Sequence, residues 1–187
     1  MNVRNSQFNV LKFLVIFLIL LEGFYAYVGI TTKDGKLFSL FLNKYANFPE
    51  WVCIGVIGIA KLLLKAAGFV TYQRDVTTLA IEGSGGVNLA WGCLGAGAIS
   101  LWIAFIAAHK CNFRFKLKWT SAGIIFIFIV NAIRVAMIVL SNHYRWTYLV
   151  DFDAHSSFNA LTYLIILGLM WIFARRYKHL IHSVKKV

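Results

Sequence analysis

Residues 119–141 read WTSAGIIFIFIVNAIRVAMIVLS, and this stretch decides the fold class. It is long and apolar enough to cross a bilayer, since a membrane-spanning helix needs about 20 mostly apolar residues. Working outward from it, three further stretches meet the same criterion, near residues 10–30, 89–108 and 156–174. The sequence therefore predicts an all-α polytopic membrane protein, a bundle of four to five transmembrane helices.

The composition excludes a water-soluble globular protein. Of the 187 residues, 60% are apolar or aromatic and 14% are charged, whereas the usual apolar share is about 45–50%. A chain this short leaves much of its surface in solvent, so it has no means of hiding that much apolar area from water. The length fits one membrane-embedded domain over 1–187. Within it we expect an N-terminal part (1–80), a core (81–176) and a basic cytoplasmic tail (177–187).

A fifth apolar segment, 48–69, allows two interpretations. It is long enough to span a membrane, but Lys61 and Lys65 lie one helical turn apart, with Gly58 and Gly68 on the same stripe. An amphipathic helix at the outer surface explains that stripe better than a helix surrounded by lipid. A surface helix implies four spans and an N-terminus inside the cell, whereas a fifth span implies an N-terminus outside. We favour the surface helix.

The distribution of charge predicts the orientation. The net charge is +12, and the basic residues are concentrated between and beside the apolar runs, a pattern that orients membrane proteins rather than one that indicates nucleic-acid binding. Lys and Arg crowd the connection 109–118 and the C-terminal tail, so we expect both in the cytoplasm. The segments 70–88 and 142–155 then lie on the extracytoplasmic side.

A short extracytoplasmic β-hairpin is expected before the second long span. The run 76–81 is rich in β-branched residues, and Gly83, Ser84, Gly85 and Gly86 follow it. A β-branched run bounded by glycines is typical of a strand, a turn and a returning strand. The hairpin would lead the chain directly into the helix predicted over 89–108.

Asn131 and Arg134 are polar groups at membrane depth. An ionisable residue inside a span is costly and is a functional-site hypothesis by default. Arg134 lies about seven residues from the outer end of its helix, roughly 10 Å deep, and Asn131 shares its helix face. In the alternative interpretation Arg134 extends outward to the interface and Asn131 bonds a neighbouring helix. We favour an interior cavity, because the residues around this pair are apolar.

Cys93 lies near the outer end of another predicted helix. Helix counting places it roughly 7 Å below the same surface that bounds Arg134. A cysteine in an apolar helix is most often inert packing, and its small neighbours could equally form a helix-packing face. Those neighbours would also let a substrate approach the sulfur, and they are Gly92, Gly95, Ala96 and Gly97.

His155 opens the last span, two residues after Asp153. The plain interpretation of this stretch is a helix N-cap at the membrane interface. However, the outer ends of three helices then hold Cys93, Arg134 and His155 at comparable depth. Nucleophilic catalysis needs such a set: a thiol, a base to take its proton, and a cation to stabilise thiolate or oxyanion.

Two residues of the outer connection compete for these roles. His143 could replace His155, and Arg145 could replace Arg134. The other cysteines, Cys53 and Cys111, are weaker candidates, and three cysteines do not make a disulfide framework. We expect no metal and no cofactor.

Three short motifs resemble the signatures of the exosortase and archaeosortase family in order and spacing. They are Gly92-Cys93-Leu94-Gly95, Asn131-Ala132-Ile133-Arg134 and His155-Ser156-Ser157-Phe158, and the resemblance covers residues 81–176. The family commonly has Ser or Thr after the cysteine, where this chain has Leu94, so a hydroxyl contact is absent here.

The resemblance implies a membrane-embedded cysteine protease and transpeptidase in a prokaryotic cytoplasmic membrane, with its site on the extracytoplasmic side. It implies Cys93 as nucleophile, His155 as general acid/base and Arg134 as the group that stabilises thiolate or oxyanion. The implied partners are substrate proteins that end in a recognition motif, a transmembrane helix and a basic cluster. Asn131, Gly92, Gly95 and Asp153 would support the site.

Two other functions stay open at this point. Asn131 and Arg134 could hold an anionic ligand in a transporter-like protein, although no broken paired helices are evident. Alternatively, the small residues around Cys93 could bind partner helices in a non-catalytic assembly subunit. Membrane lipid is an expected partner in every case, and nucleic acid in none.

Overall fold

The computed structural model describes residues 8–32, 35, 37–146 and 154–184, of which 154–157 and 179–184 are described by their backbone. Most of these residues are helical, as predicted. The elements follow in this order: α1 (Val10–Thr31), α2 (Leu40–Tyr45), α3 (Phe48–Ala66), β1 (Thr71–Gln73), β2 (Thr78–Ile81), β3 (Val87–Asn88), a 3₁₀ turn η1 (Trp91–Leu94), α4 (Ala96–Ala108), α5 (Phe113–Tyr144) and α6 (Ala154–Val184).

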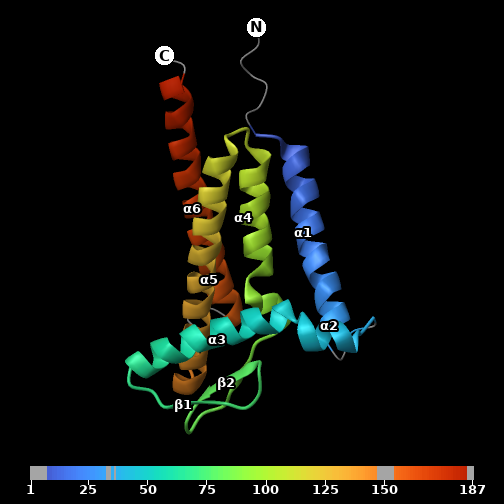
Figure 1. Cartoon of the computed structure of the whole chain (residues 1–187). Helices are drawn as coiled ribbons and strands as arrows, with labels where there is room; N and C mark the ends of the chain where they lie inside the picture. Colours follow the sequence, from blue (N-terminus) through green and yellow to red (C-terminus); the bar gives the residue numbers. More distant parts are fainter. Residues whose placement is uncertain (1–7, 33–34, 36, 147–153, 185–187) are drawn as a thin grey trace.

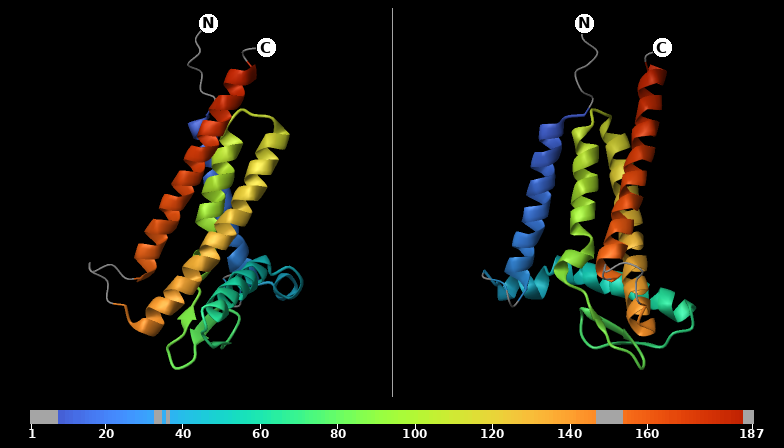
Figure 2. Two further views of the ribbon diagram at one scale, coloured as in Figure 1. Left: turned by 90° about the vertical axis from the view of Figure 1, so that its left-hand side faces the viewer. Right: turned by 180° about the vertical axis from the view of Figure 1, so that it is seen from behind.

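Four helices, α1, α4, α5 and α6, lie side by side as a bundle (Figures 1 and 2). The start of α1, the α4–α5 connection and the end of α6 share one end of this bundle. The other end carries α2, α3 and the small sheet, and α3 runs across the four bundle helices rather than parallel to them (Figure 1). The segment 48–69 is therefore a helix across the end of the bundle, the arrangement that its charged stripe favoured.

Among the residues that the structure describes, four helical segments are long and apolar enough to cross a membrane: Val10–Thr31, Leu40–Ala66, Phe113–Tyr144 and Phe158–Lys178. The second of these is the α2–α3 segment at the end of the bundle. Conversely, α4 belongs to the helix bundle but has only 13 residues. The helix expected over 89–108 is thus shorter than predicted, because residues 91–94 form a 3₁₀ turn and the α-helix begins at Ala96.

The buried face of α3 explains why it lies where it does. Its fully buried apolar residues recur at helical spacing, and they are Cys53, Val56, Ile57, Ala60 and Leu64. Residues spaced by three and four fall on one side of a helix. That side packs on α5, and β2 joins the same core with Leu79 and Ile81. Asn47 caps the helix by accepting from the backbone N–H of Glu50 at 3.3 Å, as N-cap asparagines do.

A second core lies toward the opposite end of the bundle, between α4, α5 and α6. It is built on Trp102, whose Nε1 donates to the carbonyl of Trp119 at 3.2 Å, and on Phe173. Gly123 is what lets α4 and α5 approach here, because a Cβ at that position would overlap the indole of Trp102.

The sheet is antiparallel in the order β1-β2-β3. Thr71 pairs with Ile81 in the first pair of strands, and Leu79 pairs with Val87 in the second. The predicted hairpin is therefore present as β2 and β3, with Gly83 at φ +79° in the turn. The strand β1 was not predicted, because a three-residue strand at the edge of a sheet carries too short a pattern to recognise.

Candidate functional site

Cys93 lies in the 3₁₀ turn η1, at the head of α4 and not within that helix. The turn closes through its own backbone, since the N–H of Cys93 donates to the carbonyl of Ala90 at 2.7 Å. Gly95 then ends the turn and begins α4 with φ +82°, a left-handed conformation that favours glycine. A Cβ on Gly95 would lie 3.5 Å from Cγ of Asn131, so the glycine also sets how closely η1 approaches α5.

Asn131 ties this turn to α5. Its side chain is 1% exposed, and its Nδ2 donates to the carbonyl oxygen of Cys93 at 2.9 Å. Its Oδ1 accepts from Nη1 of Arg134 at 3.2 Å. One amide therefore fixes both the backbone of the cysteine and the guanidinium of the arginine.

Arg134 reaches the sulfur of Cys93. The arginine is 7% exposed, and its Nη2 lies 3.7 Å from Sγ of Cys93, within hydrogen-bond range for sulfur. A cation held against sulfur away from bulk water interacts with it more strongly than an exposed cation would. Arg134 therefore does not extend to the interface: it faces the bundle interior, toward Cys93.

A small cavity of about 40 Å³ adjoins this triad of contacts. Its walls come from η1, α4, α5 and α6, and its lining residues are Gly92, Gly95, Gly97, Ala98, Ile127, Asn131, Arg134, Asn159, Thr162 and Tyr163. A space of this size can hold a water molecule but not a peptide. It is a small pocket against Asn131 and Arg134 rather than a substrate cleft, and Cys93 itself is not among its lining residues.

Three of those residues, Asn159, Thr162 and Tyr163, were missed in the sequence. They project from α6, and a signal was present: polar residues at 155, 159 and 162 follow helical spacing in the first part of this helix. Residues spaced in this way share one helix face. Tyr25 of α1 was also missed. Its hydroxyl would lie 3.4 Å from a Cβ placed on Gly92.

His155 and Asp153 lie at the edge of the part of the chain that the structure describes. The backbone of His155 belongs to the first turn of α6, four residues before Asn159, while its side chain lies outside the described residues. Asp153 lies outside them altogether. The structure thus brings together Cys93, Asn131, Arg134 and the two glycines, Gly92 and Gly95.

The competing residues of the outer connection lie elsewhere. The ring of His143 packs on Phe69 at 5.7 Å and on Tyr144 at 4.9 Å between centroids. Arg145 is the exposed C-cap of α5, with φ +48°. Neither lines the cavity beside Cys93, and it is Arg134, not Arg145, whose guanidinium reaches the sulfur.

The other two cysteines have different surroundings. Cys53 is fully buried against the sheet, where its thiol donates to the carbonyl of Val76 at 3.4 Å. Burial, with help from Glu50 and Asp75, raises the pKa of Cys53 to about 11. Burial also raises the pKa of Cys111, which lies in the α4–α5 connection at the opposite end of the bundle. Both thiols are therefore biased against the reactive thiolate form.

Within the described part of the chain, no group of three or more His, Cys, Asp or Glu side chains could hold a metal ion. The chemistry that the site offers is that of a thiol beside a cation. Comparison of the chain with protein-family models, with curated proteins and with solved structures finds no match. The family resemblance accordingly rests on the three motifs themselves.

Proposed function

We propose that this protein is an integral-membrane cysteine peptidase or transpeptidase that cleaves C-terminal sorting signals of exported proteins. One observation carries the proposal: Nη2 of Arg134 lies 3.7 Å from Sγ of Cys93, and Asn131 holds both residues in place. A partly exposed cysteine with a fixed cation at its sulfur is the arrangement that thiolate nucleophiles use.

The proposed reaction begins with attack of the Cys93 thiolate on a peptide carbonyl carbon. The carbonyl oxygen becomes an oxyanion, and Arg134 stabilises first the thiolate and then this negative charge. The C–N bond breaks as the leaving amine takes a proton from His155, the proposed general acid/base. The resulting thioester is resolved when water or an acceptor amine attacks it: His155 takes the proton of the attacking group, the C–S bond breaks, and Cys93 leaves as the thiolate.

The shape of the site supports approach of substrate from one side. The interior cavity has room for water only, so the peptide must reach the sulfur from outside it. Gly92 is exposed and Cys93 is partly exposed beside it. A glycine here presents no side chain, which leaves the flank of the thiol open to an extended backbone.

The apolar surface and the two ends of the bundle support the membrane orientation that we propose. Many large apolar side chains on the outside of α1, α5 and α6 are exposed, among them Leu18, Ile19, Ile125, Leu164 and Leu167. The basic connection and the basic end of α6 share the end opposite α3 (Figure 1). We place that end in the cytoplasm and the α3 end, with Cys93, on the extracytoplasmic side.

The experiment co-expresses the chain with proteins that end in a short motif, a transmembrane helix and a basic cluster, as a family-type substrate would. Loss of the C-terminal helix is read by intact mass. Cys93→Ser should abolish processing, while Cys53→Ser and Cys111→Ser, the matched controls, should process normally. His155→Ala should abolish processing too, with Cys93 still in place. Normal processing by Cys93→Ser refutes the proposed nucleophile.

A further inference from the structure

A second cavity lies away from Cys93, between α3 and β1. It has a volume of about 520 Å³, and its lining residues are Gly58, Lys61, Leu62, Lys65, Phe69, Val70 and Thr71. We call it the α3–β1 cavity. It shares no lining residue with the pocket beside Cys93, so the proposed peptidase chemistry gives it no role.

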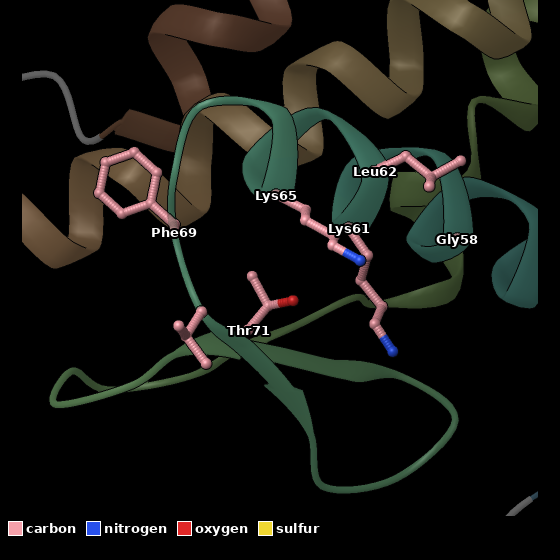
Figure 3. Close-up of a pocket in the computed structure, with 7 residues that line it drawn as sticks. Gly58, Lys61, Leu62, Lys65, Phe69 and Thr71 are labelled. Carbon is pink, nitrogen blue, oxygen red and sulfur yellow. The ribbon is translucent and has the colours of Figure 1, made fainter.

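Two lysines set the chemistry of the α3–β1 cavity. Lys61 and Lys65 are one helical turn apart, and both project from α3 toward the strand that carries Thr71 (Figure 3). Among the described residues neither ammonium makes an ion pair or a hydrogen bond. Like charges at this spacing repel each other, so an anion between them would relieve the repulsion as well as gain two charge-assisted hydrogen bonds.

The remaining walls indicate what kind of anion fits. The hydroxyl of Thr71 adds a neutral hydrogen-bond donor, and Leu62, Phe69 and Val70 add apolar surface. The volume falls in the range of about 300–1,000 Å³ typical of small-molecule sites, so it is larger than a bare inorganic anion requires. Lysine is a common point-charge ligand for phosphate oxygens. The three donors suit a phosphate, and the apolar walls suit an organic group attached to it.

We propose that the α3–β1 cavity binds a phosphate group carried by a larger molecule, with Lys61, Lys65 and Thr71 as its ligands. Two sources share this chemistry: the headgroup of an anionic lipid and a soluble phosphate ester. The exposed face of α3 also carries Trp51, Ile54 and Leu62, a mixture of apolar and basic residues typical of helices at a membrane surface. This face of α3 favours the lipid headgroup as the source of the phosphate. Binding of phosphate by the two lysines and Thr71 does not itself require a membrane.

The test measures binding to the full-length protein, purified in a neutral detergent and stripped of lipid. The probes are glycerol 1-phosphate for the soluble source and phosphatidylglycerol in detergent micelles for the lipid source. Acetate at matched ionic strength controls for a general anion effect. Binding of phosphatidylglycerol alone assigns the lipid headgroup, and binding of both probes assigns the phosphate ester whether or not acyl chains are attached.

Two variants remove the site in different ways. Lys61→Gln with Lys65→Gln should weaken binding by about tenfold or more, while Lys12→Gln with Lys44→Gln removes two exposed lysines elsewhere and should not. Gly58→Leu keeps both lysines and fills the cavity instead. Its Cβ would meet no atom within 4 Å, so the fold should be retained, and Gly23→Leu in α1 is its matched control.

The outcomes are separable from those for the peptidase. Cys93→Ser should bind the probes as the wild type does, because the two cavities are distinct. If neither phosphate probe binds, the proposal is wrong. It is equally wrong if binding survives unchanged in both the double lysine variant and Gly58→Leu.

Discussion

Replacing Asn131 by leucine probes how the site is held together. The side chain is 1% exposed, donates to the carbonyl of Cys93 and accepts from Arg134. Leucine has the same number and branching of side-chain heavy atoms but makes neither hydrogen bond. A neutral hydrogen bond contributes about 1 kcal/mol and one to a charged group about 1.5–3 kcal/mol, while bonds between membrane helices average about 0.6 kcal/mol. We therefore expect a loss of about 1–3 kcal/mol in the free energy of unfolding.

The assay is reversible unfolding of the purified protein in mixed micelles of neutral detergent and dodecyl sulfate, followed by circular dichroism. Asn142→Leu is the matched control. It lies on the same helix and donates to the carbonyl of Gly85 at 3.0 Å, but it is exposed, so we expect less than about 0.5 kcal/mol. Asn131→Asp should fall between the two, because it keeps the acceptor for Arg134 and loses the donor to Cys93. A loss of stability in Asn131→Leu no larger than that in Asn142→Leu would show that the two hydrogen bonds of Asn131 do not hold the site together.

Three further predictions concern the backbone and the opposite end of the bundle. Gly95→Ala should cost about 1–2 kcal/mol, because alanine is strained at φ +82°, whereas Gly23→Ala in α1 should not destabilise; thermal unfolding compares them. Gly123→Ala should cost about 1–3 kcal/mol by forcing α4 and α5 apart at the buried indole of Trp102, and an unchanged melting temperature would contradict this packing. Burial lowers the pKa of His109 below 6.5, so the folded state binds fewer protons than the unfolded state. The contribution of His109 to the free energy of unfolding should be complete above pH 6.5 and should be lost as the pH falls below 6.5. The variant His109→Leu should flatten this part of a plot of stability against pH.

The placement of α3 could be predicted because its apolar residues recur at helical spacing in the sequence. The buried residues of α3 recur at helical spacing while Lys61 and Lys65 interrupt its other face. That combination is inconsistent with lipid on all sides, and the helix indeed lies across the bundle (Figure 2). Apolar length alone does not distinguish the two cases, since the segment Leu40–Ala66 also meets the criterion for a span.

Local geometry around Cys93 could not be predicted from spacing. A continuous apolar run over 89–108 indicates one helix, but the left-handed conformation of Gly95 divides it into a 3₁₀ turn and α4. Glycine is compatible with both structures, so only the tertiary contact with Asn131 decides between them. The division brings the carbonyl of Cys93 within reach of the amide, which a regular helix would have bonded internally.

The pairing of Asn131 with Arg134 was visible as two polar residues on one face of an apolar helix. Their proximity to Cys93 was inferred from the depth of each residue below the membrane surface. That estimate assumed a regular helix at residues 91–94, where the chain forms η1. The α6 residues Asn159 and Thr162 escaped notice because each alone is an ordinary polar residue in a helix. They become a group only once α6 is placed against α5.

The proposed role of Cys93 depends most directly on the effect of Arg134 on the reactivity of its thiol. Alkylation of the folded protein by iodoacetamide, followed at each cysteine by peptide mass, measures that link. We predict rapid modification of Cys93, a rate about tenfold or more slower in Arg134→Gln, as loss of a charge-assisted hydrogen bond implies, and an unchanged rate in Arg145→Gln. Equal rates at Cys93 with and without Arg134 would contradict the account.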